Sequence, residues 1–173
     1  MNRKVLMVAV MVVSSCGRHR LADCRRFPDL EPAVCEQSDG GIVVMAAQSL
    51  SFGPEGLSSI LVNGRDLYFV DRQGKTMSAL HFDNGPDYFV EGLARIAKAG
   101  KAGFVNTRLE PVVPPVWDFA FPFDHGVARV CTGCVAQRGE HATVTGGRWG
   151  YIDNRGTVVL PVVYDLAALP ARW

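Results

Sequence analysis

The stretch GRWGYIDNRGTVVLPVVYDLA, residues 147–167, carries the pattern that decides the predicted fold. Apolar and polar residues alternate up to Asp153, a turn containing Gly156 follows, and TVVLP then resumes an apolar strand. Alternation of this kind on both sides of a glycine-containing turn predicts a β-hairpin, because glycine readily takes the positive φ that tight turns need. The stretch therefore favours β structure.

The same pattern occurs three times along the chain. LYFVDRQG (67–74), AGFVNTRL (102–109) and WGYIDNRG (149–156) share an aromatic residue, an aliphatic residue and then Asp or Asn. In each copy an acid preceded by an aromatic lies twelve residues beyond that Asp or Asn. Residues that recur in every copy are expected to hold turns, strand ends and the core. These predicted structural positions are Phe69, Asp71, Phe82, Phe104, Asn106, Trp117, Trp149, Tyr151, Asp153 and Tyr164.

A second pattern interleaves with the first. EGLSSILV (55–62), EGLARIAK (91–98) and HGVARVCT (125–132) each place a glycine before an apolar strand, and Gly56, Gly92 and Gly126 stand 36 and 34 residues apart. Together the patterns define a unit of about three strands in roughly 35 residues. Such a unit cannot bury its own apolar face and must stack on its neighbours. We therefore predict an all-β array of about three antiparallel units over residues 55–173.

These patterns resemble the WG-repeat family, whose unit reads approximately WGYID, a turn with Gly, VIPPxYD and an F-x-x-GLAxV stretch. The resemblance is closest in residues 147–167, good in 103–130 and degenerate in 67–83. The first copy has Leu67-Tyr68 and the second Ala102-Gly103 in place of Trp-Gly, and Leu109 replaces the turn glycine of the second copy. The last copy lacks the GLAxV strand. The resemblance implies a β-repeat module.

The third copy departs from the regular spacing. From the glycine of the second pattern to the next aromatic pattern the chain takes 13 and 12 residues in the first two cases, but 25 after Gly126. This indicates an insertion at about residues 131–146, which contains Cys131-Thr132-Gly133-Cys134 and a polar run. Loops grafted on a repeat often carry binding contacts. We therefore expect the insertion to be a binding surface.

The CTGC motif has three possible chemistries: a structural disulfide, a redox pair or half of a zinc site. Redox CxxC motifs usually open a helix, and here apolar residues flank a Thr-Gly turn instead. A zinc site needs four ligands, and the candidates His125, Cys131, Cys134 and His141 have the spacing H-x5-C-x2-C-x6-H. We favour the structural disulfide and keep the other two as alternatives.

The N-terminus, MNRKVLMVAVMVVSSC, has the architecture of an export signal. Arg3 and Lys4 precede a nine-residue apolar run, about half of the ~20 residues that span a bilayer. We predict a signal peptide at residues 1–15. The residues before Cys16 resemble the bacterial lipoprotein box, which implies lipidation of Cys16 and, with Gly17 next, placement at the outer membrane; ordinary cleavage nearby is the alternative.

The other four cysteines are an even number in a chain expected to enter an oxidising compartment, which predicts two disulfides. Four cysteines allow three pairings, and Cys24 with Cys35 and Cys131 with Cys134 close the shortest loops. Residues 16–54 are expected to be a linker with a capping segment.

Composition and motifs exclude several functions. The 18 Lys and Arg against 17 acids leave a net charge of +1, so no nucleic-acid partner is predicted. No G-x-S-x-G, phosphate loop or paired-carboxylate signature is present, and we predict no catalytic residue and no cofactor. The sequence thus favours an envelope-anchored β-repeat binding or scaffolding module, contacting the membrane through its lipid and an unknown protein or envelope polymer. The alternative is an envelope thiol-redox or zinc-dependent protein.

Overall fold

The computed structural model describes residues 20–38, 41–82, 84–137 and 143–171. Over these residues the chain forms β-strands and two single-turn 3-10 helices, η1 (Ala47–Ser49) and η2 (Leu166–Ala168), which confirms the all-β prediction. The strands are β1 (Arg20–Leu21), β2 (Cys24–Arg26), β3 (Pro32–Ala33), β4 (Cys35–Ser38), β5 (Gly41–Val44), β6 (Ser58–Val62), β7 (Asp66–Val70), β8 (Thr76–Ser78), β9 (His81–Phe82), β10 (Gly85–Pro86), β11 (Leu93–Lys98), β12 (Lys101–Asn106), β13 (Pro111–Trp117), β14 (Phe119–Ala120), β15 (Val127–Gln137), β16 (Thr143–Asp153) and β17 (Val158–Tyr164).

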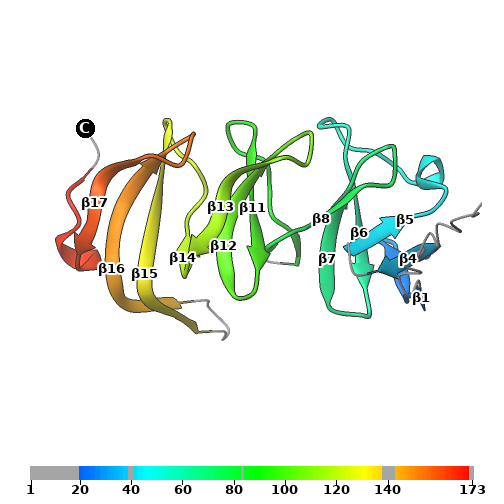
Figure 1. Ribbon diagram of the computed structural model, residues 1–173, viewed down its shortest axis with the longest axis horizontal. Coiled ribbons are helices and arrows are strands. Elements are labelled where there is room, and N and C mark those ends of the chain that lie inside the picture. The colour runs from blue at the N-terminus through cyan, green and yellow to red at the C-terminus, as the bar shows by residue number, and fades with distance from the viewer. Residues whose placement is uncertain (1–19, 39–40, 83, 138–142, 172–173) are drawn as a thin grey trace, which may run out of the picture.

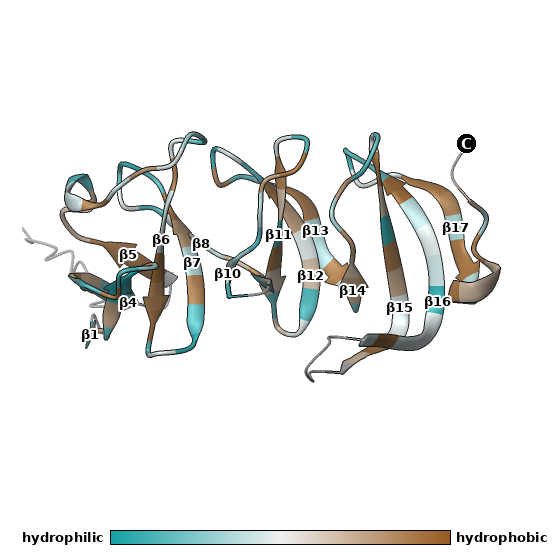
Figure 2. Cartoon of the chain, turned by 180° about the vertical axis from the view of Figure 1, so that it is seen from behind, coloured by the Kyte–Doolittle hydropathy of each residue, from teal (hydrophilic) through white to brown (hydrophobic). Residues whose placement is uncertain are grey.

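Three antiparallel units lie side by side along the long axis of the molecule (Figure 1). Each unit is a three-stranded meander: β6-β7-β8, then β11-β12-β13, then β15-β16-β17. The first strand of each meander comes from the GL pattern and the second from the WG-like pattern. β6 and β15 are largely hydrophobic, as expected for strands that bury a face against neighbouring elements, and β17 is largely hydrophobic although its side chains are exposed or half-buried (Figure 2).

The turn after the second strand is built in the same way in all three units. The side-chain oxygen of Asp71, Asn106 or Asp153 accepts the backbone N–H groups two and four residues further on, at 2.8 to 3.0 Å. These bonds satisfy donors that the turn leaves without strand partners. In the third unit, the bond from the Thr157 N–H is the largest of the effects that lower the pKa of Asp153.

The third residue after each of these side chains has a positive φ. It is a glycine in the first and third units, but Leu109 in the second, with a φ of 54°. Leu109 is fully buried and belongs to the apolar cluster that joins the first and second units. Burial of this side chain offsets the strain of a left-handed conformation, which explains why the second copy tolerates the loss of its turn glycine.

The glycine of the WG-like dipeptide lets the third strand cross closely over the second. A Cβ on Gly103 would lie 2.5 Å from the carbonyl oxygen of Val113, and one on Gly150 would lie 2.5 Å from that of Leu160. The pairing registers of both units shift beside these glycines, so the third strand bulges there. The first unit has Tyr68 at this position, and its pairing with β8 is regular.

Apolar clusters join successive units. The cluster between the first two combines Leu57 and Phe69 with Ala94, Ile96 and Val105. An equivalent cluster between the second and third combines Leu93, Phe104 and Val113 with Ala128, Val130 and Ile152. An aromatic pair extends each of them, Phe69 with Phe89 at 5.1 Å and Phe104 with Phe123 at 4.6 Å between ring centroids. The second unit therefore presents one face to the unit before it and another to the unit after it.

The N-terminal strands cover the outer face of the first unit. Strands β2 and β3 extend its sheet, and β1, β4 and β5 form a separate sheet. Ile42 and Val44 from β5 share an apolar cluster with Ile60, Val62 and Val70 of the first unit. A disulfide between Cys24 and Cys35 lies in the same cluster. This end of the array is closed.

The predicted insertion extends the hairpin of the third unit. β15 and β16 remain paired beyond the level of the other hairpins, as far as the Gln137 to Thr143 pair. The segment between them, residues 138–142, lies outside the described residues and includes His141. The signal peptide at residues 1–15 and Cys16 also lie outside them. No helix among the described residues is long and apolar enough to cross a bilayer.

Candidate functional site

The third unit has a stacking face that no further unit covers in the described part of the chain. In the second unit, the face toward the next unit is formed by Leu93 on β11, Phe104 on β12 and Val113 on β13. The strand registers place Val127, Tyr151 and Leu160 at the same positions of the third unit. We call these three residues, with Val159 beside them, the open face.

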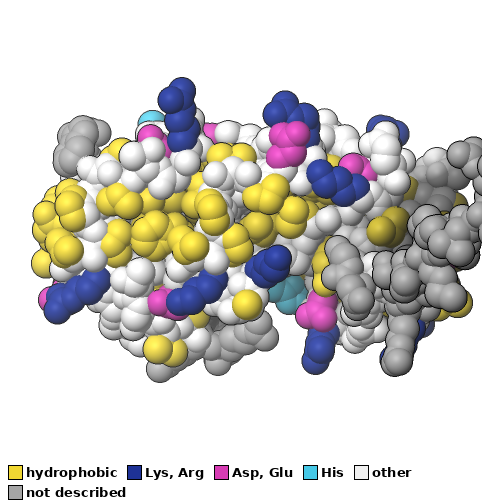
Figure 3. Space-filling view, in the orientation of Figure 1, with side chains coloured by type: hydrophobic (Ala, Val, Ile, Leu, Met, Phe, Trp, Pro, Cys, Tyr) yellow, Lys and Arg dark blue, Asp and Glu magenta, His cyan; other side chains and the backbone are white. Residues whose placement is uncertain are grey.

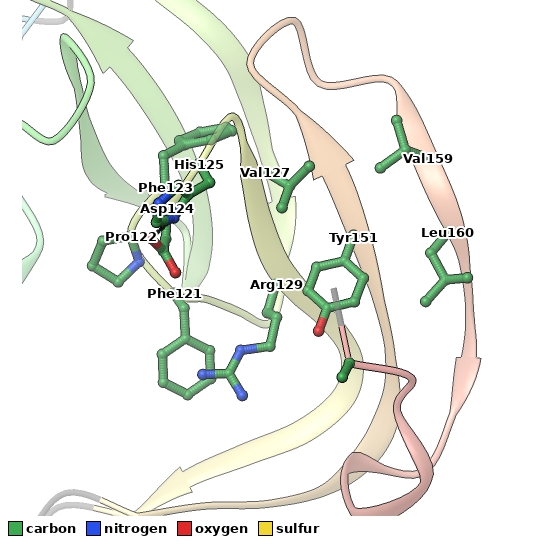
Figure 4. A pocket seen from close by; sticks show the side chains of 11 residues that line it. Phe121, Pro122, Phe123, Asp124, His125, Val127, Arg129, Tyr151, Val159 and Leu160 are labelled. Carbon is green, nitrogen blue, oxygen red and sulfur yellow. Dashed lines mark hydrogen bonds and ion pairs between the residues drawn. The ribbon is translucent and has the colours of Figure 1, made fainter. Parts of the chain in front are cut away.

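A pocket of about 980 Å³ lies over the open face (Figure 4). Its floor comes from β15, β16 and β17, and its wall comes from the connection that precedes β15. The Tyr151 hydroxyl donates a hydrogen bond of 3.2 Å to the carbonyl oxygen of Pro170, where the chain runs along one edge of the pocket. The lining residues are Phe121, Pro122, Phe123, Asp124, His125, Val127, Arg129, Tyr151, Val159, Leu160 and Ala171.

An arginine stands at the same place in the second and third units, with different surroundings. In the second unit, Arg95 is buried and makes two side-chain hydrogen bonds to the Asp87 carboxylate, at 2.6 and 2.9 Å. Its remaining terminal nitrogen donates to the carbonyl oxygen of Ala120 at 3.0 Å, in the connection to the third unit. Arg95 is thus neutralised within its own unit and bonded to the next.

In the third unit, Arg129 lines the pocket and has an aromatic neighbour instead of a carboxylate. Phe121 precedes Gly126 by five residues, as Asp87 precedes Gly92. The Arg129 guanidinium carbon lies 4.1 Å from the centroid of the Phe121 ring, a cation–π geometry that Figure 4 shows at the pocket wall. Phe121 in turn packs against Trp149 and Phe119.

His125 occupies a turn at the rim of the pocket. It and Gly126 both have positive φ, as Glu91 and Gly92 do in the second unit, and such two-residue turns join hairpin strands. The His125 ring nitrogen Nδ1 lies 2.6 Å from an Asp124 carboxylate oxygen. The Gly126 N–H donates to a Glu91 carboxylate oxygen at 2.9 Å, so consecutive turns are linked. The position of His125 is explained by the turn.

The CTGC motif forms a disulfide rather than a helix terminus. Cys131 and Cys134 are both buried, are joined to each other and pack with Trp149. The N–H of Gly133 donates to the Asp118 carboxylate at 2.7 Å. Hydrogen bonding from Lys101 and then from this N–H lowers the pKa of Asp118. The motif is thereby attached to the second unit.

Within the described ranges, no group of three His, Cys, Asp or Glu side chains is placed to hold a metal ion, so the structure shows no ligand set for the zinc alternative there. His141, the fourth candidate ligand, lies outside those ranges. The pocket includes none of the described residues of the insertion from Thr132 onward, so it lies apart from the predicted binding surface.

The recurring positions that the sequence singled out lie where a repeat would place them. Phe69, Phe104, Trp149 and Tyr151 are buried, and Trp117 and Tyr164 pair across the strands with Ala102 and Trp149. The side chain of Phe82 lies outside the described residues. The sequence patterns did not identify four residues of the arginine positions as site residues: Asp87, Arg95, Phe121 and Arg129. The arginine that recurs in GLARIA and GVARVC is the signal that could have found them.

Exposed hydrophobic side chains accompany the pocket. Hydrophobic side chains gather in a band across the second and third units on the face seen in Figure 3. Val116 on β13 and Val158, Val159 and Val163 on β17 are among the exposed large hydrophobic residues. Extended apolar surface of this kind is typical of protein interaction sites.

Comparison with known families matches three segments of the chain. The model described as WG containing repeat covers residues 69–101, 103–133 and 149–168. The gap at residues 134–148, between the second and third segments, coincides with the extension of the β15–β16 hairpin. Searches of the curated proteins and of the solved structures find no match to the chain.

Proposed function

Since the chain is a WG-repeat protein, we propose that it is a binding module that docks another protein on the open face of its third unit. The pocket over Val127, Tyr151 and Leu160 carries this proposal. The first two units use their equivalent faces to hold the unit that follows, so this face has the shape and apolar character of an established interface.

The partner should resemble a following unit in its chemistry. In the second unit the face receives small aliphatic side chains from two paired strands, Ala128 and Val130 from β15 and Ile152 from β16. We therefore propose a partner protein that presents paired strands with small aliphatic side chains. A second copy of this chain could not stack in the same head-to-tail manner, because its N-terminal strands cover the matching face of its first unit.

The docking proposal predicts selective cross-linking at the open face. A photo-reactive benzoylphenylalanine placed at Val159, which is 44% exposed and lines the pocket, should give a discrete adduct with one partner protein in cells. The matched control is Val43, which is 47% exposed on β5 at the closed N-terminal end. It should give no such adduct, and Leu160→Asp should abolish the adduct at Val159.

Two results would contradict the docking proposal. One is equal adduct formation at Val159 and Val43, which would indicate contact without a defined site. The other is an adduct that consists only of two copies of this chain. The purified partner should also bind the wild-type protein and bind the Leu160→Asp variant more weakly. Circular dichroism would verify that this variant is folded.

We further propose that the protein is exported and held at the outer membrane by lipid on Cys16. The N-terminal signal pattern supports this, and so do the two disulfides, since such bonds persist in oxidising compartments. Each buried lipid methylene contributes about 0.8 kcal/mol to membrane binding, so several acyl chains on one cysteine hold a protein firmly.

The lipid proposal predicts a change of fraction on substitution of Cys16. The full chain should incorporate labelled palmitate and sediment with outer membranes, whereas Cys16→Ser should remain unlabelled and appear in the soluble periplasmic fraction. Cys24→Ser serves as the cysteine control and should keep its label. Unlabelled wild-type protein in the soluble fraction would overturn the proposal.

A further inference from the structure

In the second unit, Arg95 shows which hydrogen-bond partners an arginine at this repeat position has when the following unit covers it. Arg95 is 2% exposed, and the Asp87 carboxylate, 4% exposed, neutralises it through the two hydrogen bonds described above. The following unit adds a third acceptor, the Ala120 carbonyl oxygen at 3.0 Å. A covered arginine in this array thus has a carboxylate and a carbonyl oxygen as partners.

The third unit lacks that carboxylate. Phe121 holds the place of Asp87, and the ring offers the Arg129 guanidinium one face but no hydrogen-bond acceptor. Among the residues that the structure describes, no acid forms an ion pair with Arg129. Covering Arg129 without a counter-charge would be costly, because an unpaired buried charge loses its hydration without compensation.

Among the described residues, the third unit also has no counterpart of the aromatic pair found at the other interfaces. Phe69 and Phe104 each receive a phenylalanine from the connection to the following unit, Phe89 and Phe123 respectively. Tyr151 occupies the same position in the third unit, and its ring faces the pocket beside Arg129 (Figure 4). Tyr151 is 8% exposed, so an aromatic ring of the partner would contact its edge in the pocket.

We propose, as an extension of the docking function above, that the partner is recognised through a carboxylate that binds Arg129 and an aromatic side chain that packs on Tyr151. Arg129 is then the residue that determines specificity. The apolar floor excludes water from the ion pair, which strengthens it. A partner segment with an acid near an aromatic residue fits these groups; one with only aliphatic residues leaves Arg129 uncompensated.

N-acetyl-L-phenylalanine, which carries both groups, is the probe for this proposal, and its uncharged amide is the reference compound. Titrations followed by the methyl NMR signals of Val127, Val159 and Leu160 should show the acid binding about tenfold or more tightly than the amide, as expected for a charge-assisted hydrogen bond. Arg129→Met should bring the two affinities together. Arg155→Met, which removes an exposed positive charge from the turn after β16, should leave the preference intact.

Phe121→Asp gives a second test that does not remove the arginine. It restores the acid found in the second unit, so Arg129 should pair within the chain and the preference for the acid should fall as in Arg129→Met. Equal binding of acid and amide to the wild-type protein, absence of methyl shifts with either compound, or a preference that survives in both variants would overturn the recognition proposal. If cross-linking at Val159 still occurred in that case, the proposal that a partner docks on the open face would stand, and only the proposed recognition through Arg129 would be wrong.

Discussion

Gly150→Ala is expected to lower the free energy of unfolding by about 3 kcal/mol, at the upper end of the usual cost of overpacking. The new Cβ would lie 2.5 Å from the Leu160 carbonyl oxygen and 2.7 Å from that of Pro161. Both atoms belong to the backbone of β17, so a side-chain rotation cannot relieve the overlap. The strand would have to move away, and its bulged pairing with β16 would be lost. Urea unfolding followed by tryptophan fluorescence measures the change.

Gly53→Ala is the matched control for that experiment. Its added Cβ would lie 3.4 Å from the end of the Glu55 side chain, which can turn aside, and 3.6 Å from the Leu57 carbonyl oxygen, an ordinary van der Waals contact. A change within about 0.5 kcal/mol is expected, as for most surface substitutions. Gly103→Ala should behave like Gly150→Ala, because its Cβ would lie 2.5 Å from the Val113 carbonyl oxygen. If the free energies of unfolding of both variants changed as little as that of Gly53→Ala, the close crossing of the second and third strands would be contradicted.

Asp87→Ala is expected to cost about 3 to 5 kcal/mol, because it leaves the buried Arg95 guanidinium without its carboxylate. Arg95→Met should cost a similar amount, since it strands the Asp87 carboxylate instead. The double variant Asp87→Ala with Arg95→Met removes both charges and should be more stable than either single variant, because neither charge is left unpaired. Denaturant unfolding of the four proteins gives the coupling between the two residues.

The exposed pair of Arg65 and Asp66 provides the comparison. Its side chains are 80% and 52% exposed, and Asp66→Ala should change stability by less than about 1 kcal/mol, as for surface ion pairs. Additive effects of the Asp87 and Arg95 substitutions, with no rescue in the double variant, would show that the two side chains do not depend on each other.

The sequence predicted the repeats well because their constraints are local. Asp71, Asn106 and Asp153 recur because each accepts two N–H groups within four residues, and such contacts leave a spaced signature. At Leu109, by contrast, the local pattern is misleading. A leucine in place of a turn glycine looks like a broken turn, yet the turn forms because a neighbouring unit buries the side chain. That compensation depends on tertiary contacts, which a local pattern does not contain.

The pocket was harder to predict for a related reason. Its residues occupy ordinary repeat positions, and only their place in the array leaves this face without a following unit among the described residues. The sequence drew attention to the insertion, which departs from the pattern, whereas Val127, Tyr151 and Leu160 follow it. The recurring arginine aligns Arg95 with Arg129 in the sequence. Only the structure shows that Asp87 contacts the first of them and Phe121 the second, so that one repeat position has opposite chemistry in the two units.

The closed N-terminal end gives the molecule a direction. The strands that cover the first unit and the outermost strand β17 lie at opposite ends of its long axis (Figure 1). Cys16 precedes β1 by four residues in the sequence, so an acyl group on it would tether the chain through its closed end. The open face would then lie at the other end of the array from the lipid, at a distance from the headgroups set by the number of repeats. Adding or deleting one internal unit would change that reach without altering the surface itself.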